Sequence, residues 1–125
     1  MIRILLIESQ SRIRQGLRMR LAIEADVQVI GEASDSQSAM QMAQAYHPNV
    51  IIIEVAPAIL GCFSAIRSLH EQMPETKIIA LSLYDDETTR SLARLAGASD
   101  FVAKSSGPQA LLRAIRKSVE QPVDQ

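Results

Sequence analysis

The chain has 125 residues, 47% of them hydrophobic and 22% charged, which suits one soluble globular domain and excludes a disordered, collagen-like or coiled-coil chain. Thirteen lysines and arginines against fourteen aspartates and glutamates give a net charge of −1, which argues against direct nucleic-acid binding driven by overall charge. The single cysteine, Cys62, permits neither an internal disulfide nor a cysteine metal cluster. A reducing cytoplasm is therefore the expected location.

Apolar runs rich in β-branched residues alternate along the chain with segments of helical periodicity. The first run is too short to cross a membrane, which takes about 20 apolar residues, and it lacks the cleavage site of a signal peptide. In chain order the pattern predicts strand Ile2–Ile7, helix Ser11–Ala25, strand Val27–Ile30, helix Ser36–Tyr46, strand Val50–Val55, helix Phe63–Gln72, strand Lys77–Leu83, helix Glu87–Ala96, strand Phe101–Ala103 and helix Pro108–Glu120.

The last two helices are predicted to be amphipathic, with one apolar face toward the core. In the fourth helix, Leu92, Leu95 and Ala96 share that face, and Gly97 ends the helix. The fifth helix opens with a proline in its first turn. Its aligned apolar residues are Leu111, Leu112, Ile115 and Val119.

Strict alternation of strands and helices with short connections predicts an α/β fold. The expected architecture is a five-stranded parallel, doubly wound (βα)5 sheet of flavodoxin-like type, with helices on both faces. One domain is expected over residues 1–120, and residues 121–125, polar with one proline, are expected to form a tail or the start of a linker.

Polar residues follow the predicted strands at the edge where doubly wound sheets bind their ligands. Glu8 and Ser9 follow the first strand, Glu54 stands at the end of the third, Ser82 in the fourth, and Lys104 directly after the fifth. Because the carboxyl ends of parallel strands meet at one edge, these side chains are expected to converge on one crevice.

Four blocks of sequence resemble the receiver domain of two-component response regulators, the CheY-like domains. The blocks are Arg3–Glu8, Val50–Glu54, Ile78–Ser82 and Gly97–Lys104, so the resemblance covers the whole chain. The wording of the last two blocks, with Leu-Leu-Arg-Ala-Ile in the final helix, looks most like receivers of NarL/FixJ (LuxR-type) transcription regulators. If the resemblance extends further, residues 121–125 would lead to an output domain that this chain lacks.

The resemblance implies a particular chemistry at the strand ends. In this family two acids after the first strand hold Mg²⁺, an aspartate ending the third strand is phosphorylated, and a serine or threonine and a lysine contact the phosphoryl group. An aromatic side chain reports its presence. The matching positions here are Glu8 and Ser9 for the acid pair, Glu54 for the phosphoacceptor, Ser82 and Lys104 for the phosphoryl contacts, and Phe101 for the aromatic switch.

Four features that depart from the family pattern argue against ordinary phosphorylation. Ser9 removes one carboxylate from the metal site, which leaves Glu8 as the residual candidate ligand and predicts Mg²⁺ binding weakened or lost. Glu54 is one methylene longer than the expected aspartate, and phosphoryl transfer tolerates such misplacement poorly. The loop Val55–Cys62 lacks the usual Met-Pro-Gly-Met-Asp-Gly wording, and Tyr84 is expected to place a ring near the pocket mouth.

The leading interpretation is a pseudo-receiver that is not an enzyme and signals through protein contacts without Asp phosphorylation. Lys104 is expected to pair with Glu54, a partial mimic of a phosphorylated aspartate or an inert replacement. The face from Glu87 to Glu120 is expected to contact protein partners: a second copy in a homodimer, a histidine kinase or an output domain.

Two alternatives remain open. The chain could be a phosphorylatable receiver of a LuxR-type regulator that uses altered chemistry at Glu54 or Ser82. From another class, it could be a nucleotide- or flavin-binding enzyme domain of the same architecture, although the segment after the first strand, Glu-Ser-Gln-Ser, contains no glycine for a phosphate loop.

Overall fold

A computed structural model provides the structure and describes residues 1–120. The tail or linker predicted at residues 121–125 lies outside the described residues. The elements are β1 (Ile2–Ile7), α1 (Ser11–Ala22), β2 (Val27–Ala33), α2 (Ser36–Tyr46), β3 (Val50–Glu54), α3 (Cys62–Gln72), β4 (Lys77–Ser82), α4 (Glu87–Ala96), β5 (Asp100–Ala103), the 3-10 turn η1 (Lys104–Ser106) and α5 (Pro108–Glu120). In this part of the chain no helix is both long enough and apolar enough to span a membrane.

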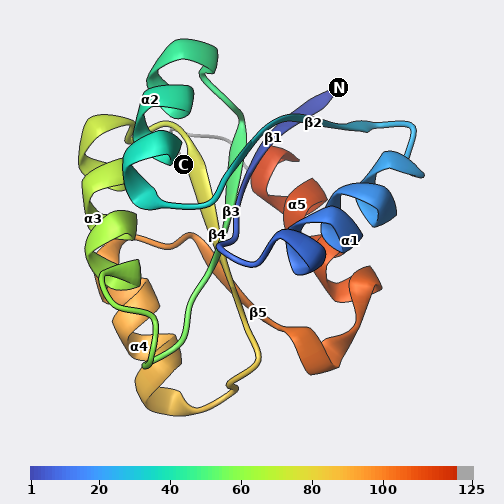
Figure 1. The fold of residues 1–125 in the computed structure, drawn as a ribbon. Coiled ribbons are helices and arrows are strands. Elements are labelled where there is room, and N and C mark those ends of the chain that lie inside the picture. The colour runs from blue at the N-terminus through green and yellow to red at the C-terminus, as the bar shows by residue number, and fades with distance from the viewer. Residues whose placement is uncertain (121–125) are drawn as a thin grey trace.

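The five strands form one parallel sheet in the order β2-β1-β3-β4-β5. Helices α2, α3 and α4 cover one face and α1 and α5 the other (Figure 1). Because successive strand residues point to opposite faces, Ile51 and Ile53 pack under the first group of helices, and Val50 and Ile52 under the second. The predicted doubly wound fold is confirmed.

Strand β2 continues three residues beyond its predicted end at Ile30. Gly31, Glu32 and Ala33 lack the apolar pattern of a buried strand, yet they pair with the end of β1 after a register shift between Ile4 and Leu5. Helix α1, in contrast, stops at Ala22 instead of Ala25. The backbone N–H of Glu24 bonds to the Leu21 carbonyl oxygen at 3.1 Å in the turn that leads to β2.

The predicted apolar face of α4 is wrong for its two leucines, whereas Ala96 is buried as predicted. Leu92 and Leu95 are 42% and 75% exposed, and the buried residues of this helix are Thr89, Ala93 and Ala96. Small residues face the core because α4 packs closely on α3: a Cβ added at Gly97, which has a φ of +122°, would lie 2.7 Å from the His70 ring. Val119 of α5 is likewise 43% exposed, so both helices carry apolar surface outward.

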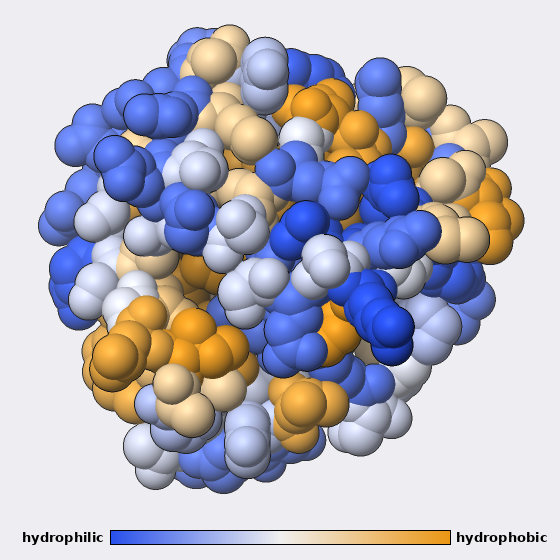
Figure 2. All heavy atoms as spheres, in the orientation of Figure 1, coloured by the Kyte–Doolittle hydropathy of each residue, from blue (hydrophilic) through white to orange (hydrophobic). Residues whose placement is uncertain are grey.

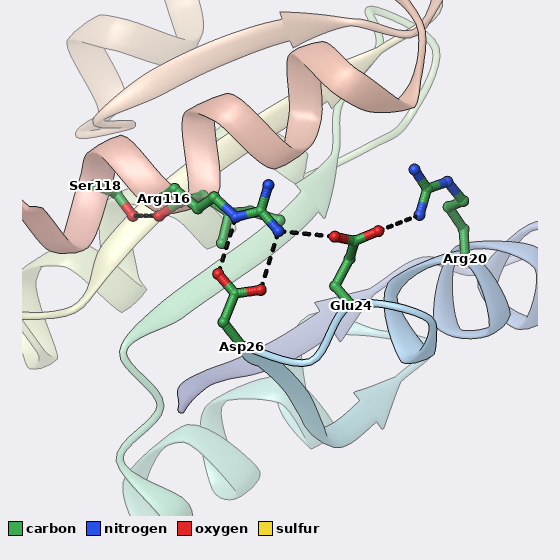
Figure 3. Close-up of polar contacts among 6 residues, drawn as sticks. Arg20, Glu24, Asp26, Arg116 and Ser118 are labelled. Atoms are coloured by element: carbon green, nitrogen blue, oxygen red, sulfur yellow. Dashed lines mark hydrogen bonds and ion pairs between the residues drawn. The ribbon is translucent and has the colours of Figure 1, made fainter.

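Four charged side chains tie α5 to the α1–β2 connection (Figure 3), and we call them the α5 ion-pair network: Arg20, Glu24, Asp26 and Arg116. The Arg116 guanidinium donates to both carboxylate oxygens of Asp26 at 2.9 and 3.0 Å and to Glu24 at 2.8 Å. Hydrogen bonds from these arginines hold the pKa values of both carboxyl groups below their usual range. The network therefore anchors the last helix to the amino-terminal half of the domain.

Candidate functional site

Three charged side chains meet at the carboxyl ends of the strands, and we call them the crevice triad: Glu8, Glu54 and Lys104. Strands β1 and β3 are neighbours, with Ile7 paired to Ile53, so the two glutamates that follow these residues lie side by side. Lys104 directly follows β5, which is separated from β3 by β4. Its side chain extends past the end of β4 to contact the two glutamates.

Lys104 contacts both acids at unequal distances. Its Nζ lies 2.5 Å from Glu54 Oε1 and 3.9 Å from Glu8 Oε1. The predicted pairing of Lys104 with Glu54 is thus present, and the contact with Glu8 is additional. The three side chains are largely withdrawn from solvent, with exposed fractions of 3% for Glu8, 12% for Glu54 and 19% for Lys104.

The polar atoms of the triad are incompletely satisfied. Glu8 Oε2 accepts a hydrogen bond from the backbone N–H of Gln10 at 3.0 Å. Within residues 1–120, the buried Oε1 atom of Glu8 has no hydrogen-bond partner, whereas Glu54 Oε1 is in close contact with the Lys104 ammonium group. Two carboxylates thus share one ammonium group.

Burial, reinforced by the neighbouring Glu8 carboxyl group, raises the pKa of Glu54 from 4.5 to about 7, against the opposing effect of Lys104. Desolvation disfavours the charged form, and a second acid beside it adds repulsion that one lysine does not cancel. Near neutral pH, Glu54 therefore carries a proton for a large part of the time. Strongly shifted pKa values in a cleft often mark functional sites.

The hydroxyl group of Ser82 is engaged by backbone groups and does not face an open site. It donates to the Val55 carbonyl oxygen at 2.7 Å and accepts from the backbone N–H of Tyr84 at 3.0 Å, and Ser82 is fully buried. This serine joins the β3–α3 loop to the β4–α4 loop. The Tyr84 side chain is 50% exposed.

A cavity of about 250 Å³ lies beside the two glutamates. Ser9 lines this cavity, and Tyr84 is not among its lining residues. The apolar rim comes instead from Ile59 and Leu60 of the β3–α3 loop, where Leu60 is 98% exposed. Figure 2 shows apolar surface at lower left, where Figure 1 places this loop.

Asp35 also lines this cavity, and sequence reasoning did not select it. It caps the amino terminus of α2 by accepting the backbone N–H of Ser38 at 2.8 Å, and hydrogen bonds from Ser38 hold its pKa below the usual range. An aspartate directly before a helical segment is a sequence signal for such a cap. The cap brings a third acid to the rim of the crevice.

Phe101 lies partly buried against the core beneath α2, α3 and α4. The Arg90 guanidinium of α4 stands over its ring, 4.8 Å from the centroid, and also bonds to Asp85 at 2.6 Å. A cation over an aromatic face is a favourable contact. The ring of Phe101 thus connects β5 to α4.

The donor set of the crevice does not fit Mg²⁺. Mg²⁺ demands near-octahedral coordination by oxygen atoms. The Glu54 carboxylate, which would be one of its ligands, already contacts the Lys104 ammonium group at 2.5 Å. In the β3–α3 loop, the Ala56 carbonyl oxygen already accepts the N–H of Ile59 at 3.0 Å and the thiol of Cys62 at 3.5 Å. Only two acids face the triad's lysine, and residues 1–120 contain no cluster of three metal-binding side chains.

The sheet order and the charged strand ends define a CheY-like receiver domain. Residues 4–116 match the family described as response regulator receiver domain, and the chain belongs to this family. The predicted resemblance is confirmed.

Two of the curated relatives are named as transcriptional regulatory proteins. The chain is 31% identical over 116 residues to the transcriptional regulatory protein LiaR of Bacillus subtilis, a match that covers 93% of this chain and 55% of LiaR. It is 28% identical over 115 residues to the transcriptional regulatory protein DegU of Brevibacillus brevis, with 92% and 49% covered. The chain thus spans about half the length of these relatives, and it aligns with a receiver of LuxR/NarL type.

Solved structures share the fold. A LuxR-family two-component response regulator from Aurantimonas has a TM-score of 0.87 at 24% identity, with 94% of this chain and 84% of that chain covered. The response regulator domain of Thermotoga maritima CheB has a TM-score of 0.83 at 24% identity, with 97% and 98% covered. At this level of identity the likeness establishes the architecture alone.

Proposed function

We propose that this domain is a pseudo-receiver, which signals through protein contacts and is not switched by phosphorylation of the residue that ends β3. The supporting observation is the ion pair at the centre of the crevice, in which Lys104 Nζ lies 2.5 Å from Glu54 Oε1. A lysine that in typical receivers contacts the phosphoryl group is here occupied by the side chain at the acceptor position.

Two properties of Glu54 disfavour phosphoryl transfer to it. Its raised pKa, about 7, reduces the ionised fraction that could attack a phosphoryl donor. Its carboxylate is also displaced by one methylene from the position of an aspartate, and phosphoryl transfer depends almost entirely on positioning and on charge stabilisation by a metal. With a donor set that does not fit Mg²⁺, the second contribution is weakened or lost as well.

Glu54 imitates a phosphorylated aspartate only in part. A phosphoryl group brings a charge of about −1.5 to −2 and three acceptor oxygens, whereas a glutamate brings at most one charge and two oxygens. We propose that the ion pair with Lys104 holds the crevice in one resting arrangement. The domain acts without catalytic turnover as a binding module in the cytoplasm.

The partners we propose bind the face from Glu87 to Glu120. It includes α4, β5 and α5, and its exposed apolar residues are Leu92, Leu95 and Val119. A histidine kinase, an output domain or a second copy of the chain are the classes of partner that this family uses. Regulation of transcription, which the names of LiaR and DegU state for those whole proteins, would involve segments beyond this domain.

One observation favours the alternative of altered phosphoryl chemistry. The buried Oε1 atom of Glu8 has no hydrogen-bond partner among the described residues and lies 3.9 Å from Lys104 Nζ, so it could contact a ligand in the crevice. The two functions differ in one outcome, which is whether the wild-type chain takes up a phosphoryl group.

The test is the intact mass of the chain after incubation with acetyl phosphate and Mg²⁺. We expect no phosphoryl adduct on the wild-type chain and no shift of its amide resonances with beryllofluoride. The matched variant Ser9→Asp/Glu54→Asp restores the usual acids, and we expect it to bind Mg²⁺ and gain the adduct. An adduct on Glu54 of the wild-type chain would overturn the proposal.

If the restored variant stays unmodified, the β3–α3 loop from Ala56 to Gly61 is the stronger obstacle. The wild-type result still decides between the two functions, because it is read directly from the mass of the unaltered chain. A typical receiver treated in the same reaction shows that the donor is active.

A further inference from the structure

A groove of about 310 Å³ runs along β5 between α4 and α5. All four residues of β5, Asp100–Ala103, line it. Strand β5 is also the last strand of the sheet, so one side of its backbone has no neighbouring strand. An edge of this kind can accept an extended segment of another chain.

The charged side chains of the groove are mostly positive. Arg90, Arg113 and Lys117 line it, and Asp100 is its one acid. The Asp100 carboxylate already accepts the backbone N–H of Phe101 at 2.8 Å. The local excess is two positive charges, in contrast to the net charge of −1 of the whole chain.

Two of these cations have no acidic partner within residues 1–120. Arg113 and Lys117 stand one turn apart on α5, are exposed, and form no ion pair there. Like charges one turn apart on a helix repel each other, and a bound anionic group would relieve that repulsion. Arg116 of the same helix does not line the groove, and it forms ion pairs with Glu24 and Asp26. The cations that line the groove on α5 are thus the ones without an acidic partner among residues 1–120.

Apolar surface lies between the cations. The ring of Phe101, under the Arg90 guanidinium, and the side chains of Ala110 and Ala114 line the groove. A ligand that complements this lining has carboxylates on either side of an apolar side chain and an extended backbone that follows β5.

We propose that this groove binds an acidic peptide segment of a partner protein, laid along β5 between Arg90 and the pair Arg113 and Lys117. This inference rests on the proposed function, because it names the chemistry of the partner that the α4–β5–α5 face recognises. The groove would recognise the peptide by its negative charges and by an extended backbone that follows β5.

The test is fluorescence anisotropy with a fluorescein-labelled peptide of glutamates and threonines around a central leucine. The comparison peptide has glutamine in place of each glutamate. We expect the wild-type chain to bind the acidic peptide at least about tenfold more tightly, with an affinity that falls as salt is added. Equal affinity for the two peptides, or binding to neither, overturns the proposal.

The variant Arg113→Glu/Lys117→Glu reverses the two cations that have no partner, and we expect its affinity to fall by at least about tenfold. The matched control is Arg67→Glu on α3, which reverses an exposed cation outside the groove, and it should change the affinity by less than about twofold. Wild-type affinity in the double variant, or an equal loss in the control, would place the binding elsewhere.

A second copy of the chain is the competing occupant. Light scattering after size exclusion measures it: a wild-type dimer that Arg113→Glu/Lys117→Glu dissociates, and that the acidic peptide does not disrupt, would overturn the proposal. The acetyl phosphate reaction is run on the same samples to separate the two proposals. A phosphoryl adduct would contradict the pseudo-receiver, whereas the peptide affinities alone decide whether the groove binds an acidic peptide.

Discussion

The crevice triad and the α5 ion-pair network contain the same kinds of side chain in opposite surroundings. The network has two acids and two bases near the surface, and its arginines hold the pKa values of Glu24 and Asp26 below their usual range. The triad has two acids and one base withdrawn from water, and the pKa of Glu54 rises to about 7.

The difference lies in charge balance and burial. An exposed, balanced network lets every carboxylate stay ionised, and its net stabilisation is small because water screens it. A buried cluster with an excess acid must take up a proton or bear the cost of an uncompensated charge. The surface network attaches α5 to the rest of the domain. The triad instead leaves one acid without a full counter-charge at the carboxyl ends of the strands.

The largest effect is expected from removing the base of the triad. Lys104→Met leaves Glu8 and Glu54 without a counter-charge and should lower the free energy of unfolding by about 2–4 kcal/mol at pH 8. The loss should be smaller at pH 5, where Glu54 is already protonated. Urea denaturation at the two pH values measures both quantities.

Lys117→Met is the matched control, because Lys117 is exposed on α5 and forms no ion pair within residues 1–120. It should change stability by less than about 0.5 kcal/mol. If Lys104→Met changes the free energy of unfolding at pH 8 as little as Lys117→Met does, Lys104 does not compensate a buried negative charge in the triad.

A smaller effect is expected in the pH dependence of stability. Because the folded-state pKa of Glu54, about 7, lies above its ordinary value of 4.5, the folded chain binds more protons between these values. Its contribution to stability is complete below about pH 4.5 and is lost as the pH rises through 7. The loss should be on the order of 1–3 kcal/mol.

Glu54→Gln should remove that loss, so the stability difference between variant and wild type changes steadily from pH 5 to pH 8. Chemical denaturation across this range measures it, and the two histidines contribute equally to both proteins. A difference that stays constant with pH would show that Glu54 titrates normally.

The smallest effect is expected in the α5 ion-pair network. Arg116→Met should lower the melting temperature by only about 2–5 °C at low salt, and less at high salt because the ion pairs are screened. Its pH dependence has the opposite sign to that of Glu54: the lowered pKa values of Glu24 and Asp26 mean that stability is present at neutral pH and lost in acid. Thermal melts at two salt concentrations and two pH values test this, and a loss that grows with salt would contradict it.

Much of the fold could be predicted because it depends on local patterns. The β-branched runs predicted every strand, and the strand ends predicted that Glu54 and Lys104 would meet. The outward position of Leu92 and Leu95 could not be predicted, because the close approach of α3 and α4 at Gly97 selects small side chains for the buried face. Periodicity identifies an amphipathic helix but does not say which face a neighbour will cover.

The sequence predicted which residues form the crevice triad, but it did not predict all of their contacts. The contact of Lys104 with Glu8 depends on how far a long side chain reaches past β4, and the bonds of Ser82 to Val55 and Tyr84 depend on loop geometry. Neither has a sequence pattern. Asp35 did have one, as a helix cap, but only the fold places that cap beside the crevice.

The central claim is that Glu54 is a buried acid that shares one lysine with Glu8, and the titration of its side-chain carboxyl carbon by NMR tests it most directly. In the wild-type chain we predict a midpoint near 7, with the Lys104 resonances shifting at the same pH. A midpoint near the ordinary 4.5, with no change at Lys104, would show an independent, solvated carboxylate and would contradict the account.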